Sequence, residues 1–146
     1  MTDTFLRSCE HWSEASRNEM EAFYALASVD YKYLAEAFNW KKWLETRQAE
    51  VGKRRLKILD VACGSGKFPL ALGQYAKITD TKILPVEYAL LDPSEFSIAE
   101  AREVLPSPFI AGAEFKSTLQ ALQCDRGTFD IIWATHALYA IPEVEL

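Results

Sequence analysis

Residues 58–68 read ILDVACGSGKF, and this stretch decides the fold. An apolar run that contains one acid, Asp60, ends in a turn with glycines at positions 64 and 66. A short apolar run bounded by a glycine turn is typical of a buried strand. Glycine lets a ligand approach the backbone closely, and the first amides of a helix have no partner within that helix. The stretch therefore predicts a strand, a tight turn and a helix that together hold a ligand.

The residues after this turn alternate between strand-like and helix-like patterns. We expect strands at residues 56–62, 86–92, 113–117 and 129–135, and helices at 68–77, 93–105 and, briefly, around 119–122. Strands that alternate with helices predict a parallel sheet joined by helical crossovers. The expected fold class is therefore α/β.

The first third of the chain has a different pattern. Apolar residues recur at three- and four-residue steps through residues 10–50, which predicts helices. We expect a break near 28–30, with Asp30 as a helix N-cap. The basic stretch at 52–55 suggests a division into an N-terminal helical segment or lid, residues 1–53, and a ligand-binding core, residues 54–146. Three aromatic residues of the first segment are candidates for the lid, with core packing as the commoner alternative: Trp12, Tyr24 and Tyr31.

Composition and charge exclude several classes of protein. The chain has 146 residues and a net charge of −5, which argues against binding to nucleic acid or to an anionic membrane. Its three cysteines are widely separated, so neither a zinc site nor a redox pair is indicated. The sequence has neither a secretory signal nor an apolar run long enough to span a membrane. We therefore expect a cytoplasmic protein.

Two glycine motifs that bind phosphates do not fit the turn. A dinucleotide fingerprint needs a third glycine at position 69, and Pro69 stands there. A Walker A loop needs Ser or Thr after Gly66 and Lys67, and Phe68 stands there. A nicotinamide-dependent oxidoreductase therefore remains only as a weaker alternative.

Three stretches together resemble the class I S-adenosylmethionine-dependent methyltransferases. LDVACGSGKF at 59–68 resembles motif I, with Ala62 where many members have the first glycine. YALLDPSEF at 88–96 is similar to the acid that closes the second strand, and FDIIWATHALYAI at 129–141 to the fourth-strand motif. The resemblance covers 54–142 and implies a Rossmann-like fold, S-adenosylmethionine as cofactor and methyl transfer without a metal. Similarity to small-molecule members implies a small-molecule acceptor.

The resemblance also implies roles for residues around the cofactor. The backbone at Gly64 and Gly66 would pass under the methionine part, and Asp60 would orient the turn or reach the methionine ammonium. Asp92 would accept hydrogen bonds from both ribose hydroxyls, because a carboxylate offers two acceptor oxygens; a helix N-cap is the alternative. The expected cofactor-binding set is Asp60, Ala62, Cys63, Gly64, Ser65, Gly66, Asp92, Pro93 and Thr135.

The acceptor side has two candidate catalytic residues, His136 and Tyr139. Histidine titrates near neutral pH, so His136 would serve as a general base or an orienting donor. The alternatives are a histidine bonded at a helix start and a core tyrosine. Asp130, at the start of the last strand, is expected to be structural rather than a metal ligand.

The number of strands conflicts with the resemblance, which implies seven where four are expected. The strand at 129–135 would lie beside that at 56–62, with an apolar free edge. We therefore expect the C-terminal strands to be missing. The chain would be part of a longer polypeptide, or would self-associate or pair with a complementing chain at this edge. A non-catalytic or fragmentary cofactor-binding module is the alternative function.

Overall fold

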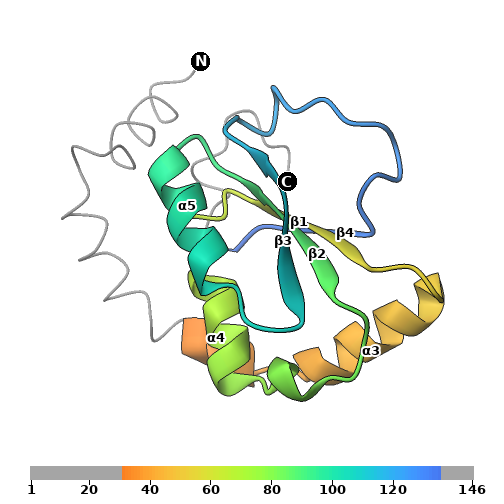
Figure 1. Cartoon of the computed structure of the whole chain (residues 1–146). Coiled ribbons are helices and arrows are strands. Elements are labelled where there is room, and N and C mark those ends of the chain that lie inside the picture. The colour runs from red at the N-terminus through yellow and green to blue at the C-terminus, as the bar shows by residue number, and fades with distance from the viewer. Residues whose placement is uncertain (1–30, 136–146) are drawn as a thin grey trace.

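Residues 31–135, the part that this computed structural model describes, form a four-stranded parallel sheet with helices against it (Figure 1). Residues 31–36 are helical. The later elements are α3 (Trp40–Val51), β1 (Lys57–Val61), α4 (Lys67–Tyr75), the 3₁₀ helix η2 (Ile78–Asp80), β2 (Val86–Leu91), α5 (Glu95–Val104), β3 (Phe109–Phe115) and β4 (Ile131–Trp133). The strand order is β3-β2-β1-β4, and every pairing is parallel. The predicted α/β class and the position of β4 beside β1 are confirmed.

The two faces of the sheet are covered differently. On one face the strands pack against side chains from α3, α4 and α5, among them Leu44, Phe68 and Ile98. On the other face four buried strand residues pack against Phe115 and against two residues of the β3–β4 connection, Leu122 and Phe129. The described helices therefore share one face, where Figure 1 shows α4 and α5 next to each other.

The direction of the crossovers explains this arrangement. The steps β1 to β2 and β2 to β3 run the same way across the sheet, and right-handed crossovers then place α4 and α5 on one face. The next step returns to the far side of β1, so its connection covers the opposite face. The strand order reverses at β1, and in such sheets ligands bind at the carboxyl ends of the strands beside the reversal.

The N-terminal helical pattern is partly confirmed. Tyr31 and Ala35 are buried in the core of the helix-covered face, and Leu44 of α3 is fully buried there. Phe38 is 51% exposed, because the helical turn through 31–36 has ended before it. The expected lid residues Trp12 and Tyr24, the expected N-cap Asp30 and the helices before it lie outside the described residues. The position of Tyr31 favours core packing over a lid.

Three expected elements are wrong in detail. The short helix around 119–122 is a turn, in which the amides of Ala121 and Leu122 each bond three residues back and the pattern does not continue. β3 begins at Phe109 rather than 113, because its first residues pair with β2 although Ile110 is exposed. β4 has three residues instead of seven, since it pairs only with the stretch of β1 from Ile58 to Asp60.

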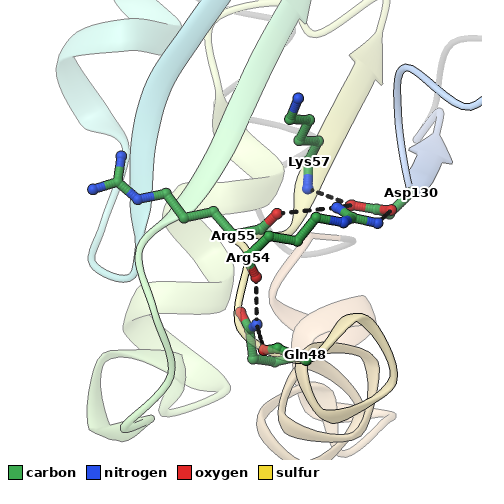
Figure 2. Close-up of polar contacts among 6 residues, drawn as sticks. Gln48, Arg54, Arg55, Lys57 and Asp130 are labelled. Carbon is green, nitrogen blue, oxygen red and sulfur yellow. Dashed lines mark hydrogen bonds and ion pairs between the residues drawn. The ribbon is translucent and has the colours of Figure 1, made fainter.

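An ion pair fastens the amino ends of β1 and β4 (Figure 2). The Arg54 guanidinium donates to both carboxylate oxygens of Asp130, at 2.6 and 2.8 Å, and the Lys57 amide donates to one of them at 2.9 Å. The Arg54 hydrogen bond lowers the pKa of Asp130. Gln48 of α3 donates to the Arg54 carbonyl at 2.8 Å. These contacts agree with a structural Asp130, at the edge of the sheet opposite the glycine turn.

Candidate functional site

The turn between β1 and α4 requires left-handed backbone at three positions. The φ angles are +54° at Ala62, +56° at Gly64 and +81° at Gly66. Glycine adopts such angles freely, whereas a residue with a Cβ is strained there. The sequence supplies glycine at two of these positions and the smallest alternative, alanine, at the third. The expectation that Ala62 preserves the turn is therefore compatible with the geometry.

Gly66 has a packing reason to be glycine. A Cβ added there would lie 2.8 Å from the Ala101 Cα and 2.8 Å from the Val104 Cγ2, both in α5. The buried Gly66 thus lets the turn approach α5 closely. The sequence pattern predicted that a glycine here allows a ligand to approach. At position 66 the close approach of α5 is enough to explain the glycine.

Asp92, directly after β2, connects the turn between β1 and α4 with the turn between β2 and α5. One carboxylate oxygen accepts the Gly64 amide at 3.0 Å, and the other accepts the Ser94 amide at 2.8 Å. The N-cap of α5 is Ser94, whose hydroxyl accepts the Ser97 amide, so Asp92 is not the cap. Burial raises the pKa of Asp92, and the two amide bonds oppose that effect. Each oxygen keeps a second acceptor site for a ligand hydroxyl.

Asp60 lies in the sheet beneath the turn and is only 2% exposed. The Tyr88 hydroxyl of β2 lies 2.5 Å from its Oδ2 atom, and the Trp133 indole nitrogen of β4 lies 3.0 Å from that hydroxyl oxygen. An indole N–H can only donate, so the Tyr88 hydroxyl accepts from Trp133 and donates to Asp60. The contacts form a directed chain from Trp133 through Tyr88 to the carboxylate.

Burial is the largest influence on Asp60, and it raises the pKa of this carboxyl to about 7. The Tyr88 and Trp133 donors lower the pKa, and the negative charge of Asp92 raises it. Two neutral groups adjoin it: burial raises the pKa of the Tyr88 hydroxyl and of the Cys63 thiol well above their ordinary values. Asp60 and Asp92 are therefore the two described carboxylates here whose pKa is raised by burial.

Backbone hydrogen bonds connect the segments that follow the strands. The Cys63 amide donates to the Leu91 carbonyl at 3.0 Å, and the Asp92 amide donates to the Phe115 carbonyl at 3.1 Å. The Ser117 amide in turn donates to the Asp92 carbonyl at 3.2 Å. These bonds hold the ends of β1, β2 and β3 together as one edge.

The structure brings most of the expected cofactor residues to this edge. Cys63 and Ser65 are buried in the turn, Pro93 is exposed, and Thr135 is half-buried two residues after β4. His136 and Tyr139, the expected catalytic residues, lie outside the described residues. The membership of these residues in a cofactor site, and their roles there, stay predictions.

Tyr88 and Trp133 belong to the site but were not expected there. Both read as core aromatics in apolar strands, and both do pack in an aromatic cluster with Trp40 and Phe68. The signal that could have revealed them is Asp60 itself. A carboxylate on the inner face of a buried strand needs donors, and neighbouring strands must supply them.

The described residues, 31–135, lack two kinds of feature. Their His, Cys, Asp and Glu side chains form no group of three that could hold a metal ion. Their helices include none with the length and apolar character needed to cross a membrane.

Comparison with known proteins agrees with this geometry. A family model described as a methyltransferase domain matches residues 59–146, which include the glycine turn, Asp92 and β4. No curated protein matches the sequence. A structure of the plantazolicin methyltransferase BpumL in complex with SAH has a TM-score of 0.51 and 16% identity, over 87% of this chain and 44% of that one. A second BpumL structure, with a triazolic desmethylPZN analog and SAH, has 15% identity and a TM-score of 0.49, over 89% and 46%.

Proposed function

Because the chain belongs to the methyltransferase domain family, we propose that it binds S-adenosylmethionine at the carboxyl ends of β1 and β2 and serves methyl transfer. The bound sulfonium supplies an activated methyl group. Methyl transfer is an in-line displacement, so the protein contributes mainly by positioning the reactants. The chain spans less than half the length of BpumL, so the activity of a whole enzyme is part of the proposal.

The observation that carries the proposal is the bond between Asp92 and Gly64. It joins the acid after β2 to the glycine turn after β1, where the strand order reverses. Both Asp92 oxygens retain acceptor sites, which suits a pair of vicinal hydroxyls such as those of ribose. The turn segment 62–66 suits the amino-acid part of the same ligand. The residues present therefore fit the cofactor.

The acceptor is proposed to be a small molecule, with His136 as general base or orienting donor and Tyr139 beside it. This rests on the sequence resemblance. BpumL is a plantazolicin methyltransferase, and one of its structures contains a desmethylPZN analog.

Cys63 and Cys124 are free thiols, which supports the proposal of a reducing, cytoplasmic location.

A binding module without its own turnover is the second candidate function. What motivates it is the number of strands: the described residues, 31–135, form four parallel strands, whereas the resemblance implies seven. Calorimetry with S-adenosylhomocysteine, S-adenosylmethionine and NADH tests cofactor binding, and methyl-transfer assays with small acceptors separate enzyme from module. Binding of NADH alone would favour an oxidoreductase and contradict both candidates.

Asp92→Ala is the sharpest single test of the cofactor site. It removes up to two hydrogen bonds to a charged acceptor, and we expect S-adenosylhomocysteine to bind about ten- to hundredfold more weakly. Calorimetry measures the affinity, and circular dichroism checks that the variant is folded.

Asp80→Ala is the matched control. Asp80 is an exposed carboxylate of η2, before β2 and so at the opposite edge of the sheet. Like Asp92→Ala, the Asp80→Ala substitution removes one negative charge, but it should leave the affinity for S-adenosylhomocysteine unchanged. Equal affinities for the two variants would rule out ribose binding by Asp92.

A further inference from the structure

The buried carboxylate of Asp60 has donors but no described cation. Among residues 31–135, the groups that influence it are Tyr88, Trp133, Asp92 and, by its proximity, Cys63, and none of them carries positive charge. A buried ionised carboxylate is costly unless it is bonded and paired. The Tyr88 hydroxyl supplies a bond, and within residues 31–135 no cation pairs with the carboxylate.

The position of Asp60 indicates what could complete the pairing. It is the second-last residue of β1, directly before the turn that the proposed function gives to the amino-acid end of the cofactor. That end carries an ammonium group. Charges interact more strongly in a poorly solvated interior than in water, so a buried carboxylate can stabilise a nearby cation without becoming exposed.

The hydrogen bonds that run from Trp133 through Tyr88 to Asp60 have a defined direction, and this direction favours the ionised carboxylate. Because the indole can only donate, it orients the Tyr88 hydroxyl so that its proton points to the carboxylate. Three strands contribute one member each: β4, β2 and β1. The chain stabilises the ionised form of Asp60 rather than the protonated form, since the ionised form is the better acceptor.

We infer that Tyr88 and Trp133 are positioning residues for cofactor binding: by donating in series they keep Asp60 ionised, and the ionised Asp60 favours the ammonium end of the cofactor. The inference rests on the proposed function and extends it to two core aromatic residues whose polar atoms are bonded to the carboxylate and to each other. It predicts that affinity for the amino-acid end depends on pH through Asp60.

The sign of this dependence follows from the charges. Burial holds the pKa of Asp60 at about 7, so the ionised fraction grows as pH rises toward and past neutrality. Affinity for S-adenosylhomocysteine, which retains the ammonium, should therefore rise with pH up to about 7 and then level. Tyr88 and Cys63 stay neutral over this range, because burial raises the pKa of each. Asp92 also titrates with a raised pKa, so a second ligand is needed to isolate Asp60.

5′-Methylthioadenosine is that second ligand. It keeps the adenine, ribose and sulfur but lacks the amino acid, so its binding depends directly on Asp92 and has no ammonium for Asp60 to pair with. The experiment measures both affinities by calorimetry from pH 5.5 to 9 for the 146-residue chain and for Tyr88→Phe, Trp133→Phe and Asp60→Asn. Tyr88→Phe keeps the ring in the aromatic cluster and removes only the hydroxyl.

Tyr88→Phe should move the midpoint of the S-adenosylhomocysteine profile up by about one pH unit, since a donor to the charged form is lost. At pH 7 this corresponds to about fivefold weaker binding. Trp133→Phe should shift the midpoint in the same direction by less, and Asp60→Asn should remove the Asp60-dependent rise. The methylthioadenosine profile should shift much less than the S-adenosylhomocysteine profile in each variant, because Asp60 affects that ligand only through its charge interaction with Asp92.

The outcomes that overturn the inference differ from those that overturn the proposed function. An unchanged midpoint in folded Tyr88→Phe, or an equal loss for both ligands, contradicts the inference alone. Failure of both ligands to bind the unmodified chain contradicts the proposed function and the inference with it. Titration of the Asp60 carboxyl carbon by NMR, without ligand, checks the hydrogen-bond chain independently: its midpoint must rise in Tyr88→Phe.

Discussion

At the residue scale, Ala62 has left-handed backbone in the glycine turn although it carries a Cβ. Its φ of +54° is favourable for glycine and unfavourable for a residue with a Cβ. Lys77 is the other non-glycine residue in 31–135 with a positive φ, and it precedes η2 far from the turn. The strain at Ala62 thus falls in the turn that we propose binds the cofactor.

Ala62→Gly is expected to keep or increase stability. Relief of left-handed strain favours the fold by about 1–2 kcal/mol, and the freer unfolded chain opposes this by roughly 0.4–1 kcal/mol. The net effect is zero to about 1.6 kcal/mol of stabilisation, measured by urea unfolding.

Gly127→Ala provides the converse control. Gly127 has a φ of +75° with nothing within 4 Å of an added Cβ, so the variant should lose about 1 kcal/mol from strain alone. Clear destabilisation by Ala62→Gly would mean that the Ala62 methyl group packs usefully in the turn.

At the element scale, the approach of the glycine turn to α5 sets the geometry of the ligand edge. Gly66 makes that approach possible, and α5 in turn begins at Ser94, bonded to Asp92. The turn, α5 and the ribose-binding candidate are therefore mechanically connected. A change in the packing of α5 should therefore alter the positions of the turn and of Asp92.

Gly66→Ala tests this connection, and Gly127→Ala, with its expected loss of about 1 kcal/mol from strain, is the control. Both positions have a positive φ, +81° and +75°, but a Cβ at Gly127 meets nothing within 4 Å. Gly66→Ala should cost roughly 1–3 kcal/mol more from overpacking against the α5 backbone. Urea unfolding of both variants gives the difference, and equal losses would contradict the packing role.

At the scale of the whole molecule, the edge of the sheet at β4 is the notable feature. Within residues 31–135, β1 is the only neighbour of β4, and the Ile132 side chain is 63% exposed. Exposed apolar edge strands invite pairing with another chain. Self-association or complementation at this edge therefore stays a prediction.

Ile132→Lys tests that prediction at the edge itself. If β4 pairs with another copy, light scattering should show concentration-dependent association of the chain, and the added charge should reduce it. Leu84→Lys, a change at another exposed apolar residue (42% exposed), should leave association unchanged. A chain that is monomeric at all concentrations would contradict self-association.

The sequence by itself determined the order of strands and helices, the parallel sheet, the turn at 62–66 and the placement of Asp60 and Asp92 at strand ends. These features follow from local spacing, which a single segment carries. The sequence did not predict that β4 is short or that residues 118–121 form a turn. The length of β4 depends on its pairing with β1, and the turn depends on the face of the sheet that the β3–β4 connection crosses.

Only the tertiary structure decided what surrounds Asp60 and Gly66. Tyr88 is 28 residues from Asp60, and Trp133 is 45 residues from Tyr88; both read locally as core aromatics. Their polar atoms meet the carboxylate because the parallel register sets Ile58 beside Tyr88 and Asp60 beside Trp133 on one face. The sequence likewise suggests that Gly66 is there for a ligand, and only the structure shows that α5 packs closely against it. Local patterns fix which backbone forms, whereas register and packing fix which side chains meet.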